Sequence, residues 1–480
     1  MGQPLAHVSS ILYNTGSACA QFDRQMKGIS CMQLQLPDSV SWLLARLNAA
    51  GYAAYVVGGC VRDALLSRQP KDWDVCTSAL PEEMQRVFHG CHVVETGLKH
   101  GTLTVVLEHV PYEITTFRVD GAYTDHRHPD GVIFVTDVRA DLARRDFTVN
   151  AMAYHPAEGL VDAFGGREDL ARGIIRCVGD PTERFTEDAL RILRALRFAA
   201  VYGFKVDAAT AAAAHALRGT LSLVAAERVR VELAKLLCGG ACGSVLRADR
   251  DILAQIMPEL APMFDFDQHT PHHRYDVWEH TVRAVESAPP TEVMRLTMLL
   301  HDAGKPASFT MDASGEGHAY GHAAVSRRLA EQALTRLKVD RATFDRVLTL
   351  VEHHDIALSC EKKLLRRRLN QFGEETVRQL IAVQRADQLA KGTVPEAEII
   401  AWADQLSTAL DAVLSEAPCF TLRDLAVNGR DMLSLGVSGK QVGVLLQTLL
   451  ESVMDERLPN DRAALLAAAG EMKTSVRQAN

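Results

Sequence analysis

Residues 55–75 read YVVGGCVRDALLSRQPKDWDV, and this stretch predicts the fold of the first part of the chain. The apolar run 53–57 indicates a buried strand, and the glycine pair after it indicates a turn into a helix. Residues 72–75 are typical of a half-buried strand. Beyond them, the patterns predict one helix and further strands, at 81–88, 103–107 and 112–119. We therefore expect an α+β unit in which helices pack on a mixed sheet.

Asp72 and Asp74 are the first candidate functional residues. They are two positions apart on the expected strand, so both carboxylates point to the same face. Paired carboxylates on one face suit two Mg²⁺ ions that bridge a triphosphate and an attacking hydroxyl. A D-x-D pair alone is common on exposed strand faces, however.

The turn upstream makes the pair more specific. Gly58 and Gly59 let the backbone approach a phosphate closely, and Arg62 adds a charge-assisted contact. A strand-to-helix turn with a surface arginine is the alternative interpretation. The combination of glycine turn, arginine and D-x-D indicates nucleotide chemistry.

Three further motifs follow the same order as in a known family. They are ETGLKHGT at 95–102, DLARRDFTVNA at 141–151 and EDALRILRALRF at 187–198. Together with the glycine turn and the D-x-D pair, they resemble the head domain of the class II CCA-adding enzymes and of their relatives, the bacterial poly(A) polymerases. The resemblance covers roughly residues 34–237.

The resemblance implies a function and a set of site residues. It implies an enzyme that adds or repairs CCA at the 3′ end of tRNA from CTP and ATP, without a nucleic-acid template and with Mg²⁺ as cofactor. Asp72 and Asp74 would hold the metal ions. Glu113 is a candidate third carboxylate, although a charge on an edge strand is an equally good interpretation. The residues expected to grip the nucleotide are Gly59, Arg62 and Arg145.

A helix expected to begin at an N-cap Thr186 offers a physical basis for choosing C and A. Asp188 and Arg191 are three residues apart and hence neighbours on one helical face. A carboxylate accepts hydrogen bonds and a guanidinium donates them, whereas cytosine and adenine both present an amino donor beside a ring-nitrogen acceptor. Guanine and uracil present the reverse order and would be rejected.

Arg194 and Arg197 continue this helix at a spacing of three and suit phosphate or ribose. Without the head motifs, an arginine-rich solvated helix face would be the simpler interpretation. The loop 118–128 resembles the family's flexible loop, with His126 where glycine is usual. Its full length implies an enzyme that adds the final A.

Histidines are dense between residues 269 and 387, and their order resembles the H…HD…D pattern of the HD metal-dependent phosphohydrolases. The resemblance implies a divalent transition metal, which imidazoles and carboxylates suit and which lowers the pKa of bound water. The expected ligands are His280, His301, Asp302 and Asp387, with His322 and His353 for a second metal site. Substrates would be phosphate ends such as a 2′,3′-cyclic phosphate on damaged RNA. A scaffold kept for packing and tRNA docking is the alternative.

The composition of the 480 residues excludes several classes of protein. A net charge of −8 argues against coating nucleic acid through bulk basicity, although residues 362–368 form a local basic run. No apolar stretch is long enough to span a bilayer. The ten cysteines form no paired framework, which favours reduced thiols and a cytoplasmic location. We expect tRNA, CTP and ATP as partners, and neither DNA nor a membrane.

The expected organisation is an α+β head followed by an elongated all-α body. Residues 1–31 lack periodicity and a secretory signal, and are expected to be a disordered extension or the result of a start placed too early. In the tail, 427–440 resembles a family motif that seats an RNA phosphate; a plain helix–helix turn is the alternative. The other parts are a nucleotidyltransferase head at 32–160, an RNA- and nucleotide-binding neck and body at 161–265, an HD domain at 266–392 and a tRNA-binding tail at 393–480.

Two rival functions stay open at this point. A bacterial poly(A) polymerase has the same chemistry, although the region after the D-x-D strand lacks the basic stretch in which those enzymes resemble one another. A rival of another class is an HD phosphohydrolase whose head is a relic that only binds RNA.

Overall fold

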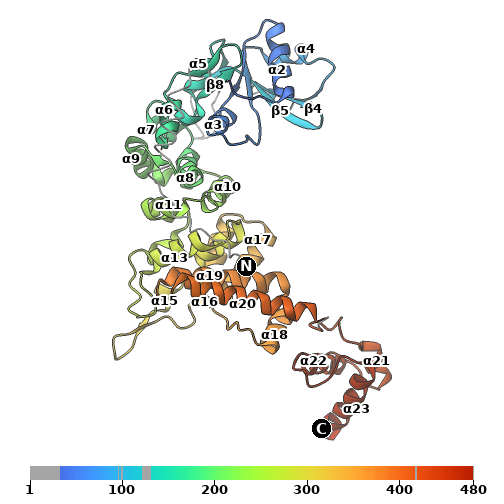
Figure 1. Ribbon diagram of the computed structural model, residues 1–480. Coiled ribbons are helices and arrows are strands. Elements are labelled where there is room, and N and C mark those ends of the chain that lie inside the picture. Colours follow the sequence, from blue (N-terminus) through green and yellow to red (C-terminus); the bar gives the residue numbers. More distant parts are fainter. Residues whose placement is uncertain (1–32, 96, 99–100, 122–130, 417–418, 479–480) are drawn as a thin grey trace, which may run out of the picture. The chain divides into compact units, whose positions relative to one another are not determined.

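The computed structural model describes residues 33–95, 97–98, 101–121, 131–416 and 419–478 (Figure 1). The chain forms two compact units that divide between Ala225 and Ala226, and each is described by itself. The expected extension 1–31 and most of the loop 118–128 lie outside the described residues. In the part that is described, no helix is long and apolar enough to cross a membrane.

A seven-stranded mixed sheet forms the centre of the first unit, in the order β3-β4-β5-β2-β1-β8-β9. Strand β1 (Ala54–Val57) is buried at every position and pairs antiparallel with β2 (Val75–Thr77) and β8 (Met152–His155). Strand β2 pairs parallel with β5 (Val110–Thr116). The outer strands are β3 (His92–Val94), β4 (Thr102–Leu107) and β9 (Gly159–Asp162). Two predictions are corrected. The strand expected at 112–119 ends at Thr116, since β6 (Arg118–Asp120) belongs to another sheet, and β2 begins at Val75, so Asp72 and Asp74 precede the strand on which they were expected.

Short helices follow or precede the strands of this sheet. Helix α3 (Gly59–Leu65) begins directly after the glycine turn, and α4 (Pro81–Val87) begins with a proline, which suits the first helical position. Helix α2 (Asp38–Ala49) buries four apolar side chains. The remaining elements are β6 (Arg118–Asp120), β7 (Val132–Phe134), α5 (Val138–Ala143), the 3-10 turn η2 (Thr148–Asn150) and α6 (Gly166–Arg172).

The helix expected to begin at Thr186 is in fact two helices. Helix α7 (Pro181–Glu187) begins at an aspartate cap, because Asp180 accepts a hydrogen bond from the amide of Thr182 at 2.7 Å. The prediction of a Thr186 N-cap is wrong, since an aspartate before a proline is the stronger start signal. The first unit is completed by α8 (Leu190–Tyr202), α9 (Ala208–Leu217), η3 (Arg218–Leu223) and the parallel pair β10 (Ile174–Ile175) and β11 (Lys205–Val206).

The second unit is helical, as expected for the body of the chain. Helix α13 (Val277–Ser287) packs on α14 (Glu292–Leu300) and on α19 (Glu374–Lys391), and α16 (His322–Arg336) packs on α17 (Arg341–Glu352). The shorter elements are α10 (Ala226–Leu237), α11 (Cys242–Ala248), α12 (Arg250–Ile256), η4 (Pro258–Met263), α15 (Lys305–Ser308) and the hairpin of β12 (Thr310–Met311) and β13 (Gly317–His318).

The C-terminal helices form two separate apolar cores. Helix α20 (Glu396–Ser415) shares a core with α18 (Lys362–Phe372) and with part of α19. A second core begins at Cys419 and includes α21 (Gly429–Ser434), α22 (Lys440–Met454) and α23 (Arg462–Gln478). By packing, the tail therefore begins near residue 419, whereas the expected tail begins at 393.

Candidate functional site

The sheet register brings the head carboxylates to one end of the central strands. Because Val75 pairs with Ile114 in the parallel β2–β5 ladder, Asp74 and Glu113 occupy equivalent positions one residue earlier on neighbouring strands. The amide of Val57 donates to the carbonyl of Asp74 at 3.0 Å, so the glycine turn begins at the same place. Glu113 is exposed on β5. The geometry thus supports grouping Glu113 with the D-x-D pair.

The carboxyl of Asp74 has a raised pKa. Its pKa is raised to about 6, first by desolvation and then by the charges of Asp72 and Glu113, while Arg145 opposes the shift. Asp74 as a whole residue is exposed, so the desolvation is local to its carboxyl. A bound cation would relieve such repulsion. Among the described residues, the three carboxylates are not close enough together to form a single metal-ligand cluster.

The glycine turn has a steric requirement at Gly58. Gly58 has a φ of +82°, and a Cβ there would lie 2.8 Å from a guanidinium nitrogen of Arg145. A side chain at this position would therefore be strained and would displace Arg145. Gly59, the expected contact, begins α3.

Arg62 belongs to a buried network of hydrogen bonds, whereas the motif predicts that its side chain contacts a phosphate. It is 6% exposed, donates to Oδ1 of Asn150 at 2.5 Å and pairs with Asp63 at 2.9 Å. Its guanidinium also lies over the rings of Phe198 and Tyr202. Arg62 therefore joins α3 to α8, and a direct phosphate contact stays a prediction.

The hydrogen-bond network of Arg62 continues from Asn150 through Asp146 to α8. The Nδ2 of Asn150 donates to Asp146 at 3.1 Å, and Arg194 donates to the other carboxylate oxygen at 2.8 and 2.5 Å. Burial would raise the pKa of Asp146, but Arg194 and Asn150 outweigh it and hold the pKa at about 2. Arg194 thus has a structural partner in the 141–151 motif, and Arg197 lies over the ring of Phe198 at 3.8 Å.

Replacing Arg194 by methionine is expected to destabilise the head by about 3 kcal/mol at pH 7, because Asp146 is left buried without its charged partner. The folded pKa of Asp146 lies below its usual 3.8, so the carboxylate contributes stability above about pH 4 that is lost as pH falls toward 2. The difference between wild type and variant, measured by urea denaturation, should therefore shrink from pH 7 to pH 3. Arg172→Met removes an exposed pair with Glu168 and should cost below about 0.5 kcal/mol. An equal Arg194 effect at both pH values would contradict this account.

The proposed base-selecting pair is arranged differently from the prediction. Asp188 lies in the break between α7 and α8 with extended backbone, and its Oδ1 accepts from the amide of Leu190 at 3.0 Å. Arg191, in the first turn of α8, donates to Glu187 at 2.5 Å and to the carbonyl of Arg184 at 3.1 Å. The prediction that both residues share one helical face is wrong, because the helix breaks between them. They remain close in the chain, since the amide of Arg191 donates to the carbonyl of Asp188 at 3.0 Å.

Four expected metal ligands of the second unit meet in one buried cluster. His280 comes from α13 and Asp387 from α19, while His301 and Asp302 follow α14 directly. The Nε2 atoms of His280 and His301 are 3.3 Å apart, and both lie 3.2 Å from Oδ2 of Asp302. Oδ1 of Asp387 lies 3.1 Å from His280. All four donor atoms lie within 4.8 Å of one another, so a single divalent ion fits the set.

A second cluster uses the other oxygen of Asp302. The Nε2 of His322 lies 3.3 Å from Oδ1, and the Nε2 of His354 lies 3.8 Å from it. The two imidazole nitrogens are 3.1 Å apart. The prediction of His353 is therefore corrected to His354. Helix α17 ends at Glu352, and the turn after it points His354 inward, while the ring of His353 packs against Phe372.

The ring orientations and charges suit metal binding. The Nδ1 atoms of His301, His322 and His354 each face a backbone carbonyl within 2.9 Å, which leaves Nε2 available as the ligand. Burial lowers the pKa of His301, but the charges of Asp302 and Asp387 outweigh it and raise that pKa to about 9. Oδ2 of Asp302 is buried between the two imidazoles and the ammonium group of Lys305, which lies 2.7 Å away.

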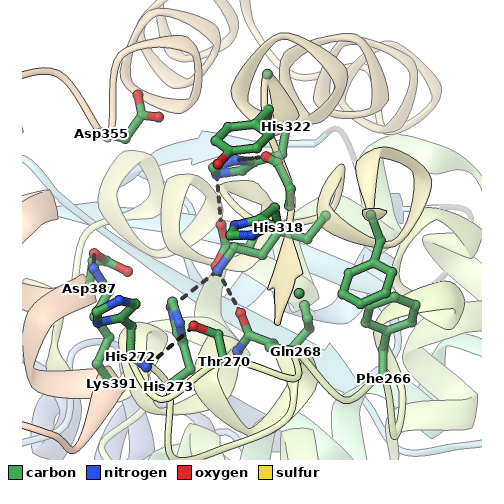
Figure 2. A pocket seen from close by; sticks show the side chains of 18 of the residues that line it. Phe266, Gln268, Thr270, His272, His273, His318, His322, Asp355, Asp387 and Lys391 are labelled. Carbon is green, nitrogen blue, oxygen red and sulfur yellow. Dashed lines mark hydrogen bonds and ion pairs between the residues drawn. The ribbon is translucent and has the colours of Figure 1, made fainter. Parts of the chain in front are cut away.

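The clusters open on a cavity of about 400 Å³, shown in Figure 2. Asp387 and Lys391 lie on one side of the view and Phe266 on the other, with His318 between them. Lys305 and Lys391 also line the cavity, and their ammonium groups pair with Asp302 at 2.7 Å and Asp387 at 2.8 Å. The cavity therefore combines candidate metal ligands, two cations and aromatic rings.

Three family models match successive parts of this chain. The poly A polymerase head domain matches residues 54–176, and the probable RNA and SrmB-binding site of polymerase A matches residues 203–264. The putative domain 2 of tRNA nucleotidyltransferase matches residues 322–469.

A relative of nearly full length decides the family. The CCA-adding enzyme of Levilactobacillus brevis is 35% identical over 447 residues, which cover 91% of this chain and 99% of that protein. The chain belongs to the CCA-adding enzyme family. The CCA-adding enzyme of Leuconostoc mesenteroides is 48% identical over 217 residues, or 45% of this chain and 54% of that protein. The family predicted from the head motifs is confirmed, while the resemblance to HD phosphohydrolases stays a prediction.

Solved structures of CCA-adding enzymes share the fold along most of the chain. That of Bacillus stearothermophilus, in complex with CTP, is 26% identical, covers 92% of this chain and 98% of its own, and superposes with a TM-score of 0.66. That of Thermotoga maritima, complexed with tRNA, is 21% identical and has a TM-score of 0.55. The expected fold class, an α+β head with a helical body, is confirmed.

The basic run of this CCA-adding family member is paired internally. On α18, Arg366 pairs with Glu456 at 2.6 Å and Arg367 with Asp455 at 3.0 Å. Lys362 pairs with Glu416, and Lys363 with Asp455 at 3.4 Å. These contacts join α18 to the ends of α20 and α22. Four cations of the run therefore link α18 to neighbouring helix ends, while Arg368 donates to the carbonyl of Ala357.

Proposed function

We propose that this chain adds or repairs the 3′-terminal CCA of tRNA, with CTP and ATP as substrates and no nucleic-acid template. The observation that carries the proposal is the 35% identity to a CCA-adding enzyme over 91% of the chain. The carboxylates of Asp72, Asp74 and Glu113 beside the glycine turn supply a site suited to that chemistry. A cytoplasmic location, with no DNA partner, is part of the same proposal.

In the proposed reaction, the 3′-hydroxyl oxygen of the RNA bonds to the α-phosphorus of the nucleotide. The bond from that phosphorus to the bridging oxygen breaks, pyrophosphate leaves with the electron pair, and the hydroxyl proton passes to solvent. Asp72 and Asp74 would hold Mg²⁺, which supplies charge neutralisation for both oxygens when bound. Gly58 keeps space for Arg145, whose guanidinium pairs with Asp141 at 3.4 Å and whose charge lowers the pKa of Asp74. Gly59, Arg145 and the arginines of α8 are proposed nucleotide contacts.

One assay distinguishes the proposal from its rivals. The purified chain is incubated with tRNA lacking its 3′ end and with each nucleoside triphosphate, singly and together. Incorporation of two C and one A supports the proposal. A long A tract would instead indicate a poly(A) polymerase, and no incorporation would favour a phosphohydrolase with a relic head.

Replacing Asp188 by asparagine is expected to reduce the preference for C and A over U and G by about 10²-fold. Asparagine keeps an oxygen for the amide of Leu190, so this hydrogen bond at the start of α8 survives, but asparagine presents a donor where a carboxylate would accept from the base amino group. Misincorporation of each nucleotide is the measurement. Asp180→Asn makes the same change at the cap of α7 and should leave the preference unchanged. Unaltered base preference in Asp188→Asn would rule Asp188 out as a base contact.

We propose a second activity, metal-dependent phosphate-ester hydrolysis, at the cavity of the second unit. The specific observation in its favour is that Asp302 offers one oxygen to each of two histidine clusters. The residues that would hold two divalent transition metals are His280, His301, Asp302 and Asp387 for one ion, and Asp302, His322 and His354 for the other. Bound metal would supply an activated water at neutral pH. Release of a monoester from a 2′,3′-cyclic phosphate in the presence of Mn²⁺ is the test, with the metal-free chain as control.

A further inference from the structure

Asn150 lies between two parts of the first unit that the proposed reaction needs together. It belongs to η2 and is 7% exposed. Just after this turn, the carbonyl of Met152 accepts from the amide of Gly58 at 3.0 Å, which holds the glycine turn. Just before it, Phe147 packs edge-on against Phe198 of α8, with ring centroids 5.7 Å apart. The residues that flank η2 therefore contact both the glycine turn and α8.

The side-chain amide of Asn150 joins these two parts through one acceptor and one donor. Its Oδ1 accepts from Arg62 of α3 at 2.5 Å, and its Nδ2 donates to Oδ1 of Asp146 at 3.1 Å. The other oxygen of Asp146 accepts from Arg194 of α8 at 2.8 and 2.5 Å. A cation thus stands on one side of Asn150 and a carboxylate on the other. An amide meets both needs, whereas a carboxylate only accepts.

This bridge spans the distance that a bound nucleotide has to span. Helix α3 begins at the glycine turn, so a fixed Arg62 also fixes that turn. Arg194 lies one helical turn after Arg191, so its contact with Asp146 fixes the start of α8. In a buried network, a group that loses its partner stays unsatisfied, which makes the arrangement strict. A triphosphate at the glycine turn and a base at Arg191 need the same two parts held together.

We propose that Asn150 is a positioning residue of the nucleotide site, which holds the start of α8 in register with the glycine turn and so sets the preference for C and A over U and G. The proposal rests on the proposed CCA addition and adds a residue that determines its specificity. Asn150 acts through Arg62 and Asp146 and is not itself a contact of the nucleotide.

Replacing Asn150 by aspartate tests the bridge with almost no change of shape. The new carboxylate still accepts from Arg62, but it faces Asp146 with no proton to donate, so the contact that leads to α8 is lost. The ratio of kcat/KM for CTP to that for UTP, on tRNA lacking its 3′ end, should fall by about tenfold. Asn48→Asp makes the same change at an exposed amide and should leave the ratio unchanged.

A second variant separates positioning from stability. Thr148 is buried on the same turn, and its hydroxyl donates to Asp169 at 2.7 Å, outside the bridge. Thr148→Val should lower the melting temperature and keep the CTP preference within about twofold of wild type. An equal loss of preference in Thr148→Val, or an unchanged ratio in folded Asn150→Asp, would overturn the proposal. If Asn150→Asp does not fold, Asn150→Ala removes both hydrogen bonds without adding a charge, and the same criterion applies.

Nucleotide binding keeps this proposal distinct from the function on which it rests. If wild type incorporates no nucleotide, the proposed CCA addition fails, and the Kd values of CTP and UTP without tRNA, measured by calorimetry with Mg²⁺, decide the role of Asn150. A preference for CTP that falls about tenfold in Asn150→Asp would support positioning. Equal Kd values for the two nucleotides in wild type, or an undiminished preference in the variant, would contradict it.

Discussion

Replacing Asp74 by asparagine is expected to lower nucleotide incorporation by at least about 10³-fold. The reason is that Asp74 lies at the centre of the head carboxylates, where it feels the charges of both Asp72 and Glu113. Loss of its charge removes a ligand for the proposed Mg²⁺ ions. Single-turnover incorporation of CMP into tRNA lacking its 3′ end is the measurement.

The stability of the Asp74 variant serves as an internal check. The pKa of Asp74 is raised above its usual 3.8, so the folded chain favours the protonated form, and that contribution is lost as pH rises through about 6. A neutral asparagine should therefore leave the melting temperature at pH 7.5 equal or higher. Glu82→Gln, an exposed change in the first turn of α4, should leave both activity and melting temperature unchanged. Retained incorporation in the Asp74 variant would refute its role as a metal ligand.

Replacing Asp302 by asparagine is expected to remove both divalent ions from the second unit and to reduce phosphate-ester hydrolysis by at least about 10³-fold. Both clusters depend on this one carboxylate, whose two oxygens face different histidine pairs. Asparagine offers one weaker oxygen ligand and an amide that donates, so the His322–His354 site loses its one carboxylate and the other site keeps only that of Asp387. Elemental analysis of Mn²⁺-loaded protein after dialysis measures the loss, with hydrolysis of a 2′,3′-cyclic phosphate as the second readout.

The controls for Asp302 lie on the same turn after α17. Asp355 lines the cavity but is exposed and belongs to neither cluster, so Asp355→Asn should retain both ions. His354→Ala should lose one ion, whereas His353→Ala should lose none. CMP incorporation should be unchanged throughout. Full metal content in Asp302→Asn, or metal loss in His353→Ala, would contradict the assignment of ligands.

The head could be predicted from the sequence because its signals are local. The buried run 53–57, the glycine turn and the D-x-D pair each occupy a few consecutive residues, and their order fixes the strands they define. The burial of Arg62 could not be predicted in the same way. It depends on Asn150 and on the rings of α8, which are distant in the chain and meet only after folding.

The predictions that are wrong concern positions where a helix boundary shifted by a few residues changes which way a side chain points. The Asp180-Pro181 pair is a recognisable helix start, and a helix beginning there ends at Glu187, just before Asp188. His353 and His354 are adjacent, so spacing alone does not distinguish them. The choice depends on the helix ending at Glu352, and that boundary is set by packing of α17 against α14 and α16.

The internal pairing of α18 has a consequence for how RNA binding should respond to salt. Each phosphate neutralised by a free lysine or arginine releases a counterion, which steepens the fall of affinity with salt concentration. Lys362, Lys363, Arg366 and Arg367 of α18 pair with the carboxylates of Glu416, Asp455 and Glu456, so they have fewer counterions to release. Neutralising Lys362 or Arg367 should thus leave the slope of log Kd against log salt unchanged, and should loosen the tail instead.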